Sequence, residues 1–395
     1  MPQPPLMVLE GNGRATLGVV RSLGRLGIPL YVGSDDRLPK SGLSRYATRR
    51  FGYPPKEAGI DAMHAAIIDR VRAWRPAVLM PVGGSEGWAT VFAHYDEYTA
   101  LTRVVASPSH EQYDRLDEDK VHLLDLAARH GVSCPRTFRP RTIEEALDLR
   151  GALPYPVIVK PPRGTGGVGV RKVEDARALA AALVQSVEVP IIQEFIAGED
   201  VELTLLCTHG ESLAGSVYRS LRTFPIPFGP STACVTVRDD ALMELGIRFL
   251  RKLSYHGVAH MDFRRDPHDG QAKLLDFNPG LTGTNDVSLA SGVNFALMLY
   301  RIALGQPVEP QFTYAVGLEY RWLLYGEVLH LLTSPHKGQV LPLMLRGGQI
   351  RTNVQLTDPL PHVTEGITLI RRHFSRWWGR RTRTRRAARQ AADLT

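Results

Sequence analysis

The sequence has few cysteines and no long hydrophobic run. Its 395 residues include three cysteines, Cys134, Cys207 and Cys234, which are odd in number and far apart. This spacing fits neither a disulfide framework nor a CxxC metal site, so we expect ordinary packing residues in a reducing compartment. Apolar runs such as Phe295 to Tyr300 are cut by Arg301, far short of the roughly 20 residues that cross a bilayer. No membrane span is predicted.

The N-terminus lacks the features of a signal peptide, and no segment repeats another. Residues 1–5 read MPQPP and precede a short apolar run, Leu6 to Leu9, without the charged start and longer apolar stretch of a secretory signal. We therefore expect a cytoplasmic protein. With 44% hydrophobic residues, a chain of this length is long enough for two or three cores.

Net charge is absent from most of the chain. Residues 371–395 contain nine arginines and one acidic residue, Asp393, which equals the whole formal charge of +8. The rest is neutral, so we expect no specific nucleic-acid binding by the body of the protein. For the tail, which includes Trp377-Trp378, three interpretations stay open: contact with an anionic membrane surface, contact with nucleic-acid phosphates, or a solvated end.

The first third of the chain alternates strands and helices. Leu6 to Glu10 predicts a strand that reaches Gly11-Asn12-Gly13, and a helical pattern over Ala15 to Leu26 leads to a second strand over Pro29 to Val32. The rhythm continues to a strand over Arg103 to Ala106. Alternation of this kind is typical of a parallel sheet flanked by helices. It predicts a Rossmann-like α/β domain over residues 1–107.

Beyond residue 107 the pattern becomes α+β. Helices and strands over residues 108–187 lead into a strand-rich region over residues 188–310, where His209-Gly210 predicts a hairpin turn. Residues 311–370 are expected to extend this last region, without recognisable chemistry, and residues 371–395 form the basic tail.

A glycine loop within residues 157–170, VIVKPPRGTGGVGV, is the first candidate for ligand binding. In a P-loop the lysine follows the glycines and the loop opens a helix, and a dinucleotide-binding loop also opens a helix. Here Lys160 precedes the glycines, and Val170 to Val173 alternates like a strand. The pattern predicts a flap between two strands whose N–H groups can turn toward one anion. A plain flexible hairpin is the alternative.

The loop and its neighbours resemble the ATP-grasp superfamily, specifically its carboxylate-amine ligases, from about Leu6 to about Gly305. Asp119-Lys120 resembles the family's first ATP lysine, Lys160 the second, and the glycine loop the flap over the phosphates. The segment QEFI with the aspartate four residues later is similar to the hinge that contacts adenine and ribose. The resemblance implies a Rossmann-like pre-ATP-grasp domain followed by a two-lobed α+β ATP-grasp domain. The implied nucleotide contacts are Lys120, Lys160, Gly164, Thr165, Gly166, Gly167, Gln193, Glu194, Phe195, Ile196 and Asp200.

Two predicted strands near residue 270 carry a candidate metal site. Asp276 and Asn278 are two residues apart on a strand, so their side chains project from one face, and Asp262 on the preceding strand can lie opposite them. Two carboxylates and an amide make a hard oxygen site that suits Mg²⁺ or Mn²⁺. The resembled family usually has Glu-x-Asn here, so Asp276 stands for the glutamate. A turn-capping aspartate and a strand-end asparagine are the alternative.

The chain departs from the resembled family directly after the candidate metal ligands. Many relatives continue Asn-Pro-Arg, with the arginine near phosphate or substrate, whereas this chain has Asn278-Pro279-Gly280. Arg264, two residues after Asp262, is the first candidate to replace that arginine, followed by Arg219 and Arg222. Each could instead be a surface arginine. The histidines at positions 256 and 260 are expected to be structural.

The resemblance implies activation of a carboxylate as an acylphosphate by ATP and Mg²⁺, followed by attack of an amine. Both substrates are then small molecules, whose identity, like the oligomeric state, stays open. A second class is an NAD-dependent oxidoreductase, because Gly11-Asn12-Gly13 follows a strand and Asp35-Asp36 comes about twenty residues later. The third glycine of that pattern is displaced to Gly18.

Overall fold

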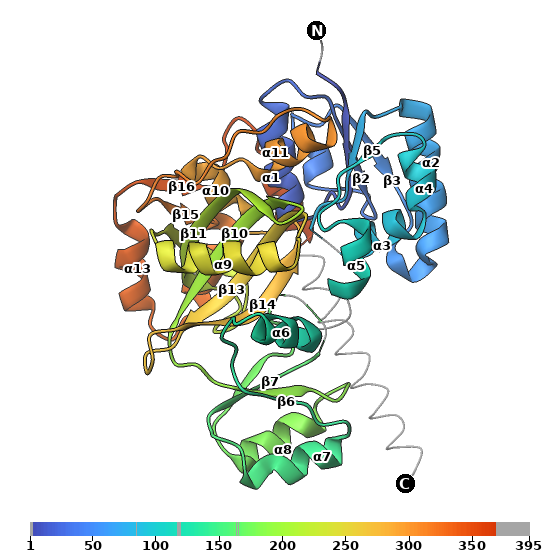
Figure 1. Cartoon of the computed structure of the whole chain (residues 1–395). Coiled ribbons are helices and arrows are strands. Elements are labelled where there is room, and N and C mark those ends of the chain that lie inside the picture. The colour runs from blue at the N-terminus through green and yellow to red at the C-terminus, as the bar shows by residue number, and fades with distance from the viewer. Residues whose placement is uncertain (1–2, 84, 117–119, 163, 165, 369–395) are drawn as a thin grey trace, which may run out of the picture.

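The computed structural model describes residues 3–83, 85–116, 120–162, 164 and 166–368. Thr165 and the basic tail over residues 371–395 lie outside the described residues, and so does the side chain of Lys120. Three sheets organise the chain: a five-stranded parallel sheet, a small four-stranded sheet and a seven-stranded sheet (Figure 1).

The N-terminal sheet is parallel throughout and has the strand order β3-β2-β1-β4-β5. All three residues of its central strand β1 are buried, which explains the apolar run at the start of the sequence. This sheet confirms the predicted α/β domain. Its strands are β1 (Leu6–Val8), β2 (Leu30–Ser34), β3 (Arg49–Gly52), β4 (Val78–Met80) and β5 (Arg103–Val104), and its helices are α1 (Arg14–Gly24), α2 (Ile60–Trp74), α3 (Ser85–Ala93) and α4 (Tyr95–Thr99).

The small sheet has the order β6-β9-β7-β8 and is antiparallel. Two helices pack on it around a separate core that includes Val157, Leu179 and Ile192, and Figure 1 shows this lobe projecting from the rest. Its strands are β6 (Thr137–Phe138), β7 (Val157–Lys160), β8 (Arg171–Val173) and β9 (Ile191–Glu194), and its helices are α7 (Ile143–Asp148) and α8 (Ala176–Val184).

The large sheet has the order β14-β13-β10-β11-β12-β15-β16, and α6 and α9 pack on it around a second core. The predicted hairpin turn is confirmed, because Thr208 pairs with Glu211 and both turn residues have positive φ. The strands are β10 (Glu199–Thr208), β11 (Glu211–Thr223), β12 (Ser231–Thr236), β13 (Gly257–Arg265), β14 (Ala272–Pro279), β15 (Glu319–Arg321) and β16 (Ile350–Thr352). The helices before and beside them are α5 (His110–Leu116), α6 (Lys120–Arg129), α9 (Asp240–Lys252), α10 (Asn285–Ser291) and α11 (Phe295–Ala303).

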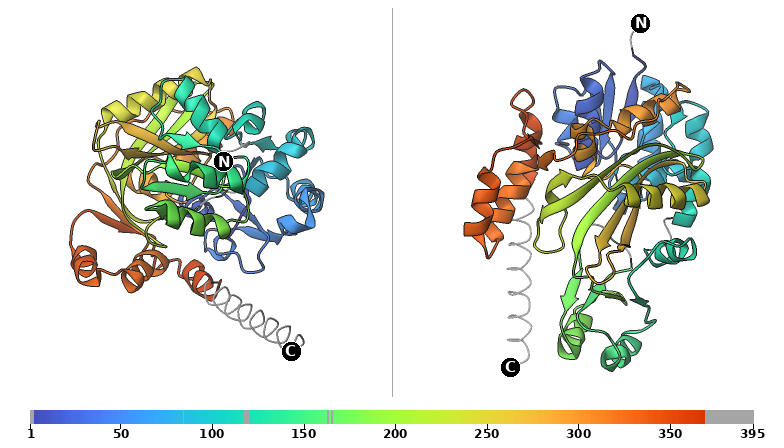
Figure 2. Two further views of the ribbon diagram at one scale, coloured as in Figure 1. Left: turned by 90° about the horizontal axis from the view of Figure 1, so that it is seen from below. Right: turned by 60° about the vertical axis from the view of Figure 1, so that its left-hand side comes forward.

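The segment after residue 310, which we call the C-terminal extension (residues 311–368), joins the large sheet to the first domain (Figure 2). Besides β15 and β16 it contains α12 (Val328–Thr333), α13 (Lys337–Leu345) and a helical stretch over residues 360–368. Buried Asp358 accepts hydrogen bonds from the Arg21 guanidinium at 2.8 Å and the Ser44 hydroxyl at 2.8 Å. The extension is therefore anchored to the N-terminal domain by an ion pair, not merely by chain connectivity.

The elements do not follow the expected domain limits in every case. Strand β9 completes the small sheet, although it lies beyond residue 187. Helix α6 packs against the large sheet, and α11 packs into the core of the first domain. All three cysteines are free thiols, and Cys207 and Cys234 are buried as packing residues. Within the described part of the chain, no helix has the length and apolar character needed to span a membrane.

Candidate active site

Lys160 of the small sheet contacts β14 of the large sheet, the strand that carries Asp276. It is the last residue of β7, is 92% buried, and donates from Nζ to the carbonyl oxygen of Leu275 at 3.3 Å. Leu275 falls at a register shift, since Asp262 pairs with Asp276 but the next residue of β13 pairs with Leu274. The bulge turns this carbonyl oxygen toward the lysine. The two predicted ends of the nucleotide site, Lys160 and Asp276, are thus brought together.

The described part of the glycine loop connects β7 and β8, as predicted for a flap between strands. Gly164, Gly166 and Gly167 all have positive φ, a conformation in which other residues are strained. A Cβ at Gly167 would lie 1.7 Å from the carbonyl oxygen of Phe228 in the loop between β11 and β12. The flap therefore rests against a loop of the large lobe, and only glycine permits this approach.

The expected adenine hinge follows β9. Gln193 is buried and donates from Nε2 to the Thr137 hydroxyl at 3.0 Å, so its side chain holds the small sheet together in this structure. Glu194 accepts from the backbone N–H of Arg136 at 3.1 Å and lies 3.8 Å from Lys273 Nζ. These contacts fix both side chains at the lobe junction.

All three nitrogens of the Arg264 guanidinium donate to residues of the hinge. Its Nε and Nη2 donate to the two oxygens of Asp200 at 2.7 and 3.0 Å, and Nη1 donates to the Ile196 carbonyl oxygen at 3.2 Å. The Lys172 ammonium lies 4.3 Å from the centre of the Phe195 ring. A bidentate pair of this kind orients Asp200 and the hinge backbone, so this geometry favours a positioning role for Arg264 over substrate contact.

The other two candidate arginines also have carboxylate partners. Arg219 donates twice to Glu199, at 2.7 and 2.9 Å. Arg222 is buried between Glu327 and Glu319 of the C-terminal extension, with distances of 2.8 and 3.0 Å. Burial opposes its charge, but the two glutamates raise the pKa of Arg222 above its ordinary value. The sequence pointed to these arginines without revealing the glutamates, because their partners come from other strands and from a segment about 100 residues away.

The three predicted metal ligands do converge. Asp262 and Asp276 are register partners on β13 and β14, and Asn278 donates from Nδ2 to Asp262 Oδ2 at 3.2 Å. The amide carbonyl of Asn278 is then the oxygen left to face an ion. Two carboxylates and an amide oxygen at one end of a β-ribbon fit Mg²⁺, which takes few protein ligands and completes its shell with water and phosphate oxygens.

Two further residues, Glu202 and His260, complete what we call the buried acid group (Glu202, His260, Asp262). His260 Nε2 lies 3.0 Å from Asp262 Oδ1 and 3.5 Å from Glu202 Oε2. Burial and the Asp262 charge raise the pKa of Glu202. Burial opposes protonation of His260, but the surrounding carboxylates raise its pKa above the ordinary value. His260 was expected to be structural. The available signal for Glu202 was a carboxylate inside the mostly apolar segment 201–207.

The residues of the dinucleotide alternative have other uses in the fold. Asn12 Nδ2 donates to Asp36 Oδ2 at 2.8 Å, which closes the loop after β1 onto the loop after β2. Gly18 lies on α1 where a Cβ would be 2.2 Å from Asp286 Oδ1. Its role is to admit a carboxylate from α10, and a phosphate-binding turn is not needed to explain it.

Known proteins resemble this chain in the same region. Residues 118–284 match the model of the ATP-grasp domain. The carbamoyl phosphate synthase large chain of Archaeoglobus fulgidus is 24% identical over 204 residues, covering 49% of this chain and 19% of that one. Alpha-aminoadipate–LysW ligase of Sulfurisphaera tokodaii is 31% identical over 109 residues, covering 26% and 38%. Biotin carboxylase of Campylobacter jejuni, solved as a beta-gamma-ATP complex, superposes with a TM-score of 0.64 at 18% identity, covering 80% and 74%.

The small sheet and the large sheet form a two-lobed α+β architecture. Residues 118–284 match the ATP-grasp domain, and the predicted fold class is confirmed over most of the chain. The chain spans about a fifth and less than two fifths of the length of the two curated relatives, at 19% and 38%.

Proposed function

We propose that this protein is an ATP- and Mg²⁺-dependent ligase that joins a carboxylate to an amine. The observation that carries the proposal is the contact between Lys160 and the strand of Asp276, which puts a buried cation beside a hard oxygen site. Matches to the ATP-grasp domain and to a named amino-acid ligase support the same class.

The proposed reaction has two balanced steps. An oxygen of the carboxylate attacks the γ-phosphorus of ATP, the bond to the β–γ bridging oxygen breaks, and ADP leaves. The amine nitrogen then attacks the acyl carbon of the acylphosphate, phosphate leaves with the bonding electrons, and the nitrogen loses a proton. No covalent nucleophile from the protein is required.

The chain contributes charge and enclosure to this reaction. Lys160 would offset negative charge on the phosphates, and the N–H groups of the glycine loop would donate to the same oxygens. Asp262, Asp276 and Asn278 would hold Mg²⁺, which supplies further charge neutralisation at the phosphates. A flap resting on the loop of Phe228 would exclude water that hydrolyses an acylphosphate.

The acylphosphate provides a direct test. Purified protein with Mg²⁺-ATP, a panel of ¹⁸O-labelled carboxylic acids and a panel of amines should release ADP, and phosphate should acquire one ¹⁸O from the acid. Hydroxylamine in place of the amine should yield a hydroxamate. Release of ADP with unlabelled phosphate for every acid, or no nucleotide binding at all, would contradict the proposal.

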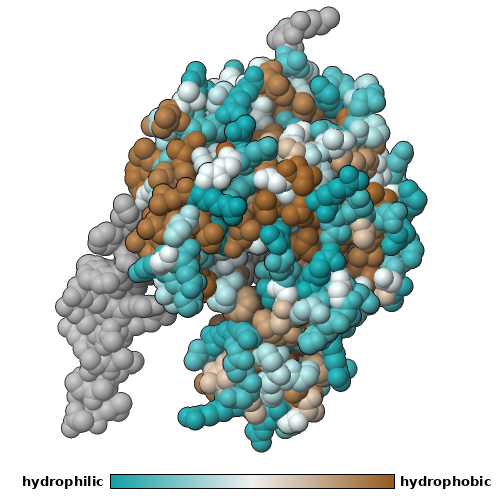
Figure 3. All heavy atoms as spheres, turned by 90° about the vertical axis from the view of Figure 1, so that its left-hand side faces the viewer, coloured by the Kyte–Doolittle hydropathy of each residue, from teal (hydrophilic) through white to brown (hydrophobic). Residues whose placement is uncertain are grey.

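We also propose that the C-terminal extension touches an anionic membrane surface. Leu332, Leu341 and Leu345 are 61%, 45% and 76% exposed on α12 and α13, and Figure 3 shows hydrophobic side chains gathered on this side of the molecule. The arginine-rich residues 371–395 follow the extension in sequence. Exposed apolar side chains followed in the sequence by a basic segment suit an interfacial contact.

Vesicle sedimentation tests this second proposal. Vesicles of phosphatidylcholine with phosphatidylserine should pellet the intact protein, and binding should weaken in a Leu341→Gln, Leu345→Gln variant and in a chain ending at residue 370. Equal pelleting with pure phosphatidylcholine, or unchanged binding in both variants, would overturn it.

A further inference from the structure

A cavity of about 500 Å³ lies between α1, α10 and the C-terminal extension. All of its lining residues lie outside residues 118–284, the range that matches the ATP-grasp domain. The cavity is therefore built from the parts of the chain that the ATP-grasp match leaves without a role. Its walls carry side chains of both charges, which is unusual for a space inside a folded chain because buried charges normally pair.

Arg14 supplies the positive charge at the inner end of the cavity. Its guanidinium lies 4.5 Å from the centre of the Trp322 ring, and Nη1 donates to the Ser231 carbonyl oxygen at 3.0 Å. This is its one hydrogen bond to the described residues, although the guanidinium has five donors. Burial lowers the pKa of Arg14 from its ordinary value, and an arginine stays charged nonetheless. Its remaining donors are available to a ligand in the cavity.

Asp286 supplies the negative charge next to it. Its Oδ2 accepts from the Tyr320 hydroxyl at 3.3 Å, and it forms no ion pair with Arg14 within 4.0 Å, although both line the cavity. Gly18 makes room for it, because a Cβ there would lie 2.2 Å from Asp286 Oδ1. Burial raises the pKa of Asp286, and the Arg14 charge opposes this shift. Gly18 on α1 thus leaves room for the Asp286 carboxylate near the Arg14 guanidinium, and the two groups form no ion pair.

The mouth of the cavity is basic. Arg25 and Arg351 are exposed there, and Arg351 has no carboxylate partner among the described residues. Lys40 is paired with Glu365 at 3.1 Å, so these two charges cancel. The excess of positive charge at the mouth favours a ligand with an anionic group there, in addition to an anionic group at Arg14.

The inner end of the cavity connects to the buried acid group through a short chain of contacts. Ser231, whose carbonyl oxygen receives Arg14, donates from its hydroxyl to Glu202 at 3.2 Å. Glu202 in turn lies 3.5 Å from His260, which contacts Asp262. Ser231, Glu202 and His260 therefore connect Arg14 to the proposed metal ligand Asp262.

We propose that this cavity binds an amino acid, with its carboxylate on Arg14, its ammonium group on Asp286 and an acidic side chain toward Arg25 and Arg351. A guanidinium and a carboxylate that face one space without pairing complement a zwitterion, because each charge of the ligand finds an opposite partner. The assignment of this amino acid as a substrate rests on the proposed ligase function. Its binding to the cavity does not.

Binding and turnover can be measured separately. The twenty L-amino acids are tested as probes by calorimetry and by their effect on ADP release, with succinate and putrescine as probes that each lack one of the two charges. L-Aspartate or L-glutamate should bind best. Arg14→Lys and Asp286→Asn should weaken binding about 10- to 100-fold, as expected for loss of a charge-assisted pair, while nucleotide binding stays unchanged.

Two further variants guard against misfolding and nonspecific charge effects. Arg351→Gln, at the exposed mouth, should reduce the preference for acidic over neutral amino acids without weakening glycine binding. Arg248→Gln, an exposed arginine of α9 that pairs with Glu244, should change nothing. The cavity assignment falls if no amino acid binds, if succinate binds as tightly as glutamate, or if the Arg14 and Asp286 variants bind like the parent. If ADP release depends on an added carboxylic acid but is unchanged in the Arg14 variant, the ligase proposal is supported and the cavity is not its substrate site.

Discussion

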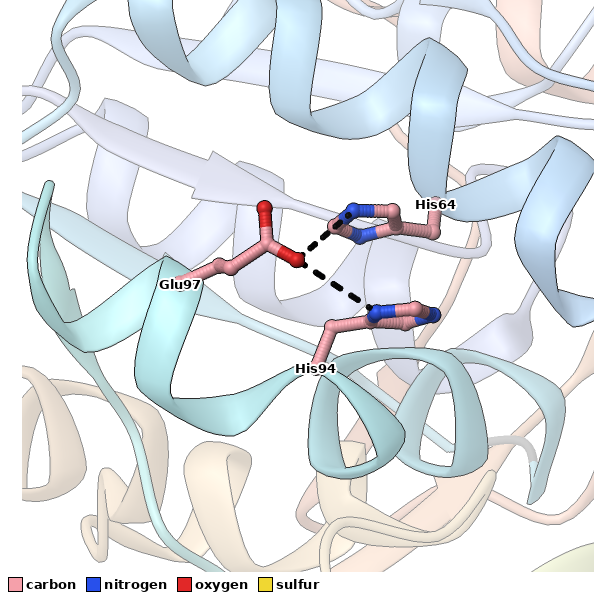
Figure 4. A group of neighbouring side chains, drawn as sticks. All are labelled: His64, His94 and Glu97. Atoms are coloured by element: carbon pink, nitrogen blue, oxygen red, sulfur yellow. Dashed lines mark ion pairs between the residues drawn. The ribbon is translucent and has the colours of Figure 1, made fainter.

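The described part of the chain contains two histidine–carboxylate groups with ligand atoms close enough to hold a metal ion, and they differ in almost every other respect. The buried acid group, Glu202 with His260 and Asp262, lies in the large sheet, and the second group, His64 with His94 and Glu97, lies on the first domain. In the second group both histidines approach one oxygen of Glu97, at 3.6 and 3.7 Å (Figure 4). We call it the surface histidine group.

Ring geometry separates the two groups. The His64 and His94 rings are stacked, with centroids 3.7 Å apart and planes 12° from parallel. An imidazole binds a metal along the lone pair in its ring plane, and two nearly parallel planes share no such point. The surface histidine group is therefore not a preformed metal seat, whereas Asp262 and Asp276 face one another across paired strands.

The pKa directions differ as well. Carboxylates surround His260 and raise its pKa despite burial, while burial and the neighbouring His94 lower the pKa of His64. Judged by residue type and distance alone, the two groups would be equally good candidates for a metal site. The surroundings decide which group stabilises a cation, and this is the difference that mutations should expose.

The largest effect is expected from Asp262→Asn. The change keeps the shape but removes one of the proposed metal ligands, so ADP release should fall more than the roughly 10- to 100-fold typical of residues that only orient a ligand. Steady-state turnover at several Mg²⁺ concentrations measures it. Glu97→Gln in the surface histidine group is the matched control and should leave turnover unchanged. Equal losses of turnover in both variants would contradict the conclusion that only the buried acid group takes part in metal binding.

Lys160→Met should have the next largest effect, on nucleotide affinity. Removal of a buried cation beside Asp276 should weaken binding of a fluorescent ATP analogue by about 1.5–3 kcal/mol, the usual range for a hydrogen bond to a charged group. Lys56→Met, an exposed lysine of the first domain paired with Glu86, should leave the affinity as it is. An unchanged affinity for the Lys160 variant would place the phosphates elsewhere.

Gly167→Ala should lower turnover because it disturbs the conformation of the flap. Its φ of 71° is strained for alanine, and the added Cβ would meet the Phe228 carbonyl oxygen. We expect a fall in turnover of roughly tenfold, measured as ADP release. Gly59→Ala, beside α2 of the surface histidine group, has a similar φ of 94° but open space around it. It should cost about 1–3 kcal/mol of stability without a change in turnover.

Much of the fold was readable from the sequence because it depends on local patterns. The alternation up to Arg103 predicted the parallel sheet, and the spacing of Asp276 and Asn278 predicted their common face. Glu202 could not be assigned in this way, since its partners on β13 are about 60 residues distant in the chain. The same holds for Arg222, whose charge is balanced by Glu327 from the C-terminal extension.

The cavity was beyond sequence reasoning for a related reason. Gly18 looked like part of a turn pattern, and its actual neighbour Asp286 lies on another helix. Arg14 had no distinguishing signal, because the Trp322 ring and the Ser231 carbonyl oxygen that hold it come from segments more than 200 residues away in the sequence. Residues 311–368, where no chemistry was expected, supply nine of the 21 residues that line that space. Long-range pairing, and not residue type, defines these sites.

The smallest predicted effect concerns the pH dependence of stability at the surface histidine group. His64 is 12% exposed and is faced by His94 and Arg72, which lower its pKa, and by Glu97 and Asp61, which raise it. Burial and His94 prevail, so the folded state holds His64 neutral below the pH at which the unfolded chain takes up a proton. The unfolding free energy should therefore decrease as the pH falls through the ordinary histidine value toward the lowered one.

Replacement of His64 by asparagine removes this titration while keeping a polar side chain. The variant should lose less stability than the parent between pH 7.5 and pH 5.5, with a difference below about 1 kcal/mol, as for other partly screened charges. Urea unfolding at both pH values measures it. His268→Asn, in the exposed turn between β13 and β14, serves as the matched control and should track the parent. A steeper loss in the His64 variant would mean that Glu97 and Asp61 dominate, and that the surface histidine group favours a cation as the buried acid group does.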